Sequence, residues 1–199
     1  MMRKEITSCL LCGRELENDV TWLYFTERFP KVICERCEMK FEKLQADTSD
    51  GHIALYRYNE AMRDFLHRYK FMKDVVLAKV FRKELHACLR KLDGIVVPIP
   101  LHPEKLKERT FAQVDELLNE ANIPYEHMLE KRTTESQSSK NRAERLATVQ
   151  LFKPSRKVKP QHYIVFDDIY TTGTTIEHAK RALLEAGAET VSSVSLIRG

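Results

Sequence analysis

Two adjacent aspartates between an apolar run and a threonine-rich turn restrict the fold of this chain most strongly. The run at 163–166 is apolar without interruption, as in a strand covered on both faces of its sheet. Asp167 and Asp168 follow it, and after the turn apolar residues recur at helical spacing from 176 to 186. A second apolar run, at 191–197, predicts another strand. Strand, helix and strand with short connections imply a right-handed crossover, and hence an α/β fold whose parallel sheet is flanked by helices.

The aspartates and the turn also predict a ligand site, because ligands of open parallel sheets bind beyond the carboxyl ends of the strands. Two ionised carboxylates only accept hydrogen bonds, so they suit a ribose diol, and they can hold Mg²⁺ through waters. A helix that starts after the turn presents free N–H groups, which favour phosphate. An ordinary helix cap would use one threonine and leave the other residues unexplained. The predicted ribose 5-phosphate site comprises Asp167, Asp168, Thr171, Thr172, Gly173, Thr174 and Thr175.

The segment from Val165 to Thr175 resembles the signature of type I phosphoribosyltransferases, which bind phosphoribosyl pyrophosphate. The resemblance implies the type I phosphoribosyltransferase fold. It also implies that the aspartates contact ribose hydroxyls, that the turn wraps the 5-phosphate, and that Mg²⁺ accompanies phosphoribosyl pyrophosphate.

Four of the 5 cysteines form two CxxC pairs near the N-terminus. Such pairs place four thiolates around Zn²⁺, so Cys9, Cys12, Cys34 and Cys37 predict a small structural zinc ribbon. One pair alone would also suit a redox motif, whereas two argue against it. A polar, turn-rich stretch at 45–51 separates this module from the rest. We expect a zinc ribbon at 1–48 and a phosphoribosyltransferase-like domain at 49–199, with a helical hood at 49–92 and the core at 93–199.

The order of motifs along nearly the whole chain is similar to that of the ComF family. The similarity rests on the two CxxC pairs, Tyr69-Lys70-Phe71, Val97-Pro98-Ile99-Pro100, Arg109, Phe111, Gln113 and the final Leu196-Ile197-Arg198. It implies a pyrophosphate side formed by Pro100, Leu101, His102, Arg109, Arg142 and Arg145, the last two in a basic connection that begins at Arg132.

Membership of that family would imply a competence-related role in the uptake of transforming DNA. The implied partners are the DNA-translocating helicase of the competence system and single-stranded DNA. The alternative is an active phosphoribosyltransferase that transfers ribose 5-phosphate to an acceptor. Thr110, Ala112 and Thr148 stand where the family usually has Gly, Asn and Asn, and these departures favour the competence role over turnover.

Charge and hydropathy agree with a phosphate-rich partner. Residues 51–100 carry 10 basic and 5 acidic side chains, and they interleave bases with aromatic residues at 56–58 and 68–71. This interleaving is typical of single-strand binders, but it also fits an amphipathic helix, which we expect over 55–92. We expect no secretory signal, and the sequence has no apolar stretch of about 20 residues, so we expect a cytoplasmic protein that reaches the inner face of the membrane through a partner.

Overall fold

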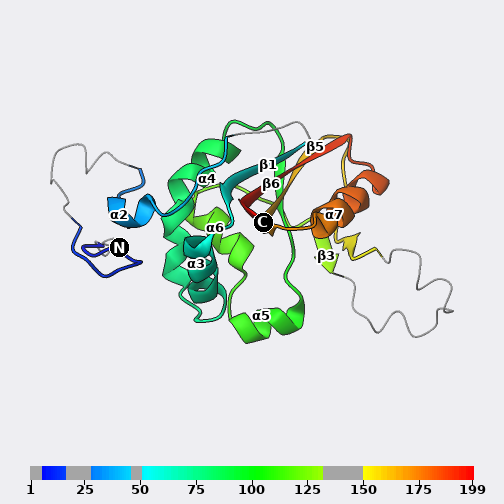
Figure 1. Ribbon diagram of the computed structural model, residues 1–199. Coiled ribbons are helices and arrows are strands. Elements are labelled where there is room, and N and C mark those ends of the chain that lie inside the picture. Colours follow the sequence, from blue (N-terminus) through cyan, green and yellow to red (C-terminus); the bar gives the residue numbers. More distant parts are fainter. Residues whose placement is uncertain (1–5, 17–27, 46–50, 132–149) are drawn as a thin grey trace.

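The computed structural model describes residues 6–16, 28–45, 51–131 and 150–199 of the 199-residue chain (Figure 1). Its main sheet contains β1 (His52–Arg57), β2 (Ile95–Pro98), β5 (His162–Tyr170) and β6 (Thr190–Arg198) in the order β1-β6-β5-β2. All three pairings in this sheet are parallel. A short antiparallel pair, β3 (Leu129–Lys131) and β4 (Phe152–Pro154), lies beside it. The predicted α/β fold with a parallel sheet is confirmed.

The helix predicted over 55–92 is wrong at its start, because β1 reaches Arg57 and pairs with β6. The pattern of burial in β1 alternates, with His52, Ala54 and Tyr56 buried, and this period of two belongs to a strand. Three helical segments follow: α3 (Glu60–Lys70), the 3₁₀ helix η1 (Val75–Phe81) and α4 (Arg82–Leu89).

Residues after β2 form two helices, α5 (Pro103–Arg109) and α6 (Gln113–Glu120). Thr110 ends α5 in the left-handed region at φ 71°. That conformation favours glycine, the residue that the family resemblance leads one to expect here.

Strand β5 is longer than predicted, since the sequence placed its end at Phe166. On one side its pairing with β6 continues to Tyr170 and Arg198, whereas on the other side β2 ends at Pro98 opposite Phe166. Asp167 and Asp168 therefore lie within β5 but beyond the end of β2. Helix α7 (Thr174–Glu185) follows, and Gly187 lies just beyond its end at φ 106°.

The two faces of the sheet carry separate cores. Helix α7 packs on one face through Ile176 and Leu183 against Val165. On the other face the α3, η1, α4 and α6 segments pack against Phe166 and Leu196. Figure 1 shows α7 on one side of the sheet and α3, α4 and α6 on the other.

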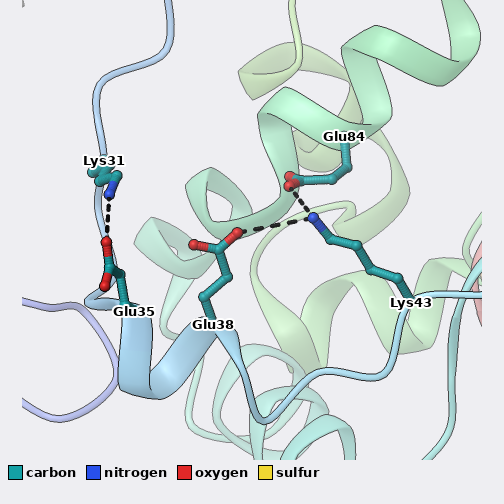
Figure 2. Close-up of polar contacts among 5 residues, drawn as sticks. All are labelled: Lys31, Glu35, Glu38, Lys43 and Glu84. Carbon is teal, nitrogen blue, oxygen red and sulfur yellow. Dashed lines mark hydrogen bonds and ion pairs between the residues drawn. The ribbon is translucent and has the colours of Figure 1, made fainter.

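The N-terminal segment is attached mainly by apolar contacts. Phe41 packs edge-on against Phe81, with ring centroids 5.0 Å apart, and Cys9 and Cys37 belong to the same buried cluster. Figure 2 shows ion pairs of this segment, among them Lys43 with Glu84 of α4. These side chains are partly exposed, so the ion pairs contribute little to the free energy of unfolding. The four-residue helix α2 (Glu35–Glu38) carries Cys37 into this core.

Candidate ligand pocket and cysteine cluster

The two aspartates line a pocket at the carboxyl end of β2, between α3, α5 and α6. The structure brings them together with Pro100, Leu101, His102 and Arg109, which the sequence assigned to the opposite side of the same ligand. The full lining is Lys70, Ile99, Pro100, Leu101, His102, Lys105, Arg109, Ala112, Gln113, Val114, Asp115, Lys131, Asp167 and Asp168. Arg142 and Arg145 lie outside the described residues.

A break in the alternation of β5 turns both carboxylates toward this pocket. Phe166 and Ile169 pack against the same core cluster although they are three residues apart. Strict alternation would separate residues of one face by two. The change occurs at the aspartate pair, where the Asp168 amide donates to Asp167 Oδ1 at 2.8 Å.

Lys70 at the end of α3 supplies a positive charge that the sequence did not assign to the site. Its Nζ lies 2.6 Å from Asp168 Oδ2, and the two side chains are only 13% and 8% exposed. No spacing in the sequence links a lysine of α3 to the end of β5. The only sequence signal for Lys70 was its position in Tyr69-Lys70-Phe71, one of the motifs that are similar to the ComF family. Lys105 and Lys131 add two further cations to the lining.

Burial and the neighbouring charge favour the protonated form of Asp167. Burial is the larger cause and the Asp168 carboxylate the next, and together they raise the pKa of Asp167 to about 8. The Asp168 amide, Lys70 and Lys131 act in the opposite direction. A divalent cation beside the pair would favour ionisation of both acids.

The predicted phosphate loop connects β5 to α7 and has the form of an open helix N-terminus. The residue at the N-cap is Gly173, at φ 78°, and no side chain caps the helix. The first N–H groups of α7 consequently have no acceptor within the helix. Thr171 and Thr172 are exposed, and Thr172 Oγ1 lies 3.0 Å from Thr174 Oγ1.

Gln113 is fixed in one orientation in the wall of the pocket. Arg109 Nη1 donates to Gln113 Oε1 at 2.7 Å, and Tyr69 Oη donates to its backbone carbonyl at 2.7 Å. Because arginine only donates, the side-chain atom facing Arg109 must be the oxygen. Gln113 Nε2 has no partner among the described residues, and the side chain is buried.

The four N-terminal cysteines converge as predicted and could hold a metal ion. The sulfur atoms of Cys9, Cys12, Cys34 and Cys37 all lie within 4.8 Å of one another. Cys12 and Cys34 are 3.7 Å apart, close to the edge of about 3.8 Å of a tetrahedron with the usual zinc–sulfur bond length.

Backbone groups favour a thiolate at one of these cysteines. Burial acts to raise the pKa of the Cys9 thiol. Hydrogen bonds from the backbone of Cys34, Cys12 and Leu11 nevertheless lower this pKa to about 6. Burial, followed by the neighbouring cysteines, raises the pKa of Cys37 to about 12. Of these two cysteines, only Cys9 is therefore favoured as a thiolate near neutral pH.

Comparison with known proteins shows which family this chain resembles. The phosphoribosyl transferase domain family matches residues 109–199. Competence protein ComFC of Streptococcus pneumoniae is 36% identical over 96% of this chain and 99% of its own length. Competence protein ComFC of Bacillus subtilis is 30% identical over 96% of this chain and 94% of its own. Among solved structures, adenine phosphoribosyltransferase from Leishmania tarentolae is a distant likeness, with a TM-score of 0.40 and 10% sequence identity. The match covers 79% of this chain and 94% of the chain of that structure.

The parallel sheet, the aspartate pair and the matching domain define a protein of the type I phosphoribosyltransferase class. Within this class, the sequence identity to the two ComFC proteins over nearly the whole chain shows the family. The chain belongs to the ComF family. Within the described ranges, no helix is both long and apolar enough to cross a membrane.

The raised pKa of Asp167 predicts a pH-dependent stability. An unfolded aspartate has a pKa of about 3.9, so the folded protein binds an extra proton between that pH and about 8. This contribution is fully present below the unfolded pKa and is lost as pH rises through the folded pKa. We expect Asp167→Asn, which cannot ionise, to raise the melting temperature more at pH 9 than at pH 5. An equal change at both pH values would contradict the assignment, and Asp64→Asn on the exposed face of α3 is the control.

Proposed function

We propose that this protein acts in the uptake of transforming DNA with phosphoribosyl pyrophosphate or ribose 5-phosphate bound in its pocket. Two similar proteins bear the name competence protein ComFC, which supports the first part. The second part depends on one observation: two carboxylates share a strand end that leads directly into an open helix N-terminus.

In this proposal each part of the site binds one part of the ligand. Asp167 and Asp168 accept hydrogen bonds from the ribose hydroxyls, and the N–H groups and hydroxyls of 171–175 donate to the 5-phosphate. The segment 100–102 and Arg109 face the pyrophosphate. Lys70, Lys105 and Lys131 supply the positive charge that this group needs. Mg²⁺, which favours carboxylate and phosphate oxygens, would be held by the aspartates and neutralise the pyrophosphate.

An active phosphoribosyltransferase is the second candidate. The observation that favours it is the pocket itself, which gathers three carboxylates, Arg109 and three lysines. Positioning and charge neutralisation are what departure of pyrophosphate from ribose requires. Steady release of pyrophosphate in the presence of a nucleobase would support this candidate over a role in binding alone.

The competence role also implies partners and a location. We propose that the DNA-translocating helicase and single-stranded DNA are the partners, and that the protein works in the cytoplasm, at the inner face of the membrane through that helicase. Basic residues at 51–100 support contact with DNA. If they neutralise phosphates, the logarithm of the binding constant should fall with the logarithm of salt concentration by about 0.7 per contact.

We expect ribose 5-phosphate to stabilise the folded protein. At a hundred times its dissociation constant, a ligand contributes about 2.7 kcal/mol, or roughly 5 to 10 °C in melting temperature for a chain of this size. Asp168→Asn and Gly173→Ala should abolish the shift. Gly187→Ala is the matched control, because Gly187 also has positive φ and lies at the opposite end of α7. A shift of the wild-type size in the first two variants would place the ligand elsewhere.

We propose zinc as the ion held by the four cysteines, since four thiolates at tetrahedral spacing suit it best. Protein purified without added metal should contain about one zinc ion per chain. Cys34→Ser should release the ion, whereas Cys88→Ser should retain it, because Cys88 lies in α4 outside the cluster. Metal-free wild-type protein that is folded under reducing conditions would refute the proposal.

A further inference from the structure

Tyr170, the last residue of β5, contacts two side chains from other strands of the sheet, His52 in β1 and Arg198 in β6. Its ring stacks on His52 with centroids 4.0 Å apart and an interplanar angle of 26°. Arg198 Cζ lies 5.5 Å from the centroid of the same ring. Stacking and cation–π contacts of this kind hold an aromatic ring in one plane. The Tyr170 carbonyl is also held, since it accepts from the Gly199 amide at 2.8 Å.

His52 is a fixed platform for this ring, because both of its nitrogens are hydrogen-bonded in the interior. Only 2% of the residue is exposed. Its Nδ1 lies 2.9 Å from Ser193 Oγ and its Nε2 3.0 Å from Ser195 Oγ. Ser195 Oγ also donates to the Ile197 carbonyl, and Ser193 Oγ to the Gly51 carbonyl at 3.4 Å, so both serine hydroxyls are themselves held in place. Two serines of β6 thereby prevent rotation of the imidazole.

The far end of Tyr170 meets the phosphate loop at its glycine. A Cβ atom added to Gly173 would lie 2.5 Å from the Tyr170 hydroxyl oxygen and 2.8 Å from Cζ. Gly173 also has φ 78°, which side chains other than glycine rarely adopt. The loop can therefore turn against the phenol only because residue 173 has no side chain. Among the described residues other than its two chain neighbours, none comes closer to that position.

We propose that Tyr170 is the positioning residue of the phosphate loop. His52 and Arg198 hold the phenol, and the phenol supports Gly173 and the first turn of α7 in the conformation that receives phosphate. Tyr170 acts through the loop and does not contact the ligand itself. The inference rests on the proposed function, because the group received by the loop is the 5-phosphate of the ligand.

The test measures loop order and phosphate affinity separately in Tyr170→Leu. Without ligand, ¹⁵N order parameters of 171–175 should fall from about 0.85 in the wild type to below about 0.6. The dissociation constant for ribose 5-phosphate should rise on the order of tenfold, as expected when a binding loop loses its alignment. Tyr170→Phe, which keeps the ring in contact with His52 and Arg198, should restore both values. If Tyr170→Leu does not fold, Arg198→Met removes one side of the support and should shift both values in the same direction.

Tyr163→Leu is the matched control, because Tyr163 is buried in the same strand at the end remote from the loop. It should lower the melting temperature and leave loop order and affinity unchanged. Wild-type order and affinity in Tyr170→Leu, or equal losses in Tyr163→Leu, would overturn the inference. Failure of the wild-type protein to bind ribose 5-phosphate would refute the proposed function, and the order parameters of the loop alone would then decide the role of Tyr170.

Discussion

The parallel pairing of β5 with β6 is the interaction on which the rest of the structure depends. It runs from His162 opposite Thr190 to Tyr170 opposite Arg198, and so continues beyond the end of β2. The unpaired side of β5 leaves room for the pocket, while the paired side keeps the strand extended. Without β6, the aspartates would lie beyond the last paired residue of β5, and the loop into α7 would have no fixed origin.

Helix α3 connects the pocket to the cysteine cluster. Arg68 donates to the carbonyls of Leu10 and Leu11, at 2.9 and 3.1 Å, within the first CxxC knuckle. Two residues further on, Lys70 pairs with Asp168. The orientation of α3 thus depends on the knuckle, and one of the cations in the pocket depends on α3. The cysteine module thereby contributes to the geometry of the pocket without lining it.

The sequence predicted the elements that are determined locally and missed those that depend on distant partners. The strand at 163–166, the helix that ends before Gly187 and the cysteine cluster follow from periodicity and spacing, and all three are present. Strand β1 was mistaken for helix, since its identity depends on pairing with β6, far along the chain. For the same reason the ion pair of Lys70, the raised pKa of Asp167 and the contact of Tyr170 with His52 had no signature in the sequence.

The central claim is that occupation of this pocket is needed for DNA uptake. It is tested most directly by measuring the transformation frequency of cells that carry Asp168→Asn in the chromosomal gene, with the amount of protein checked in each strain. The account predicts that this strain transforms far less than one carrying the control Asp64→Asn, at equal protein levels. Normal transformation by a variant that has lost ribose 5-phosphate binding would contradict it.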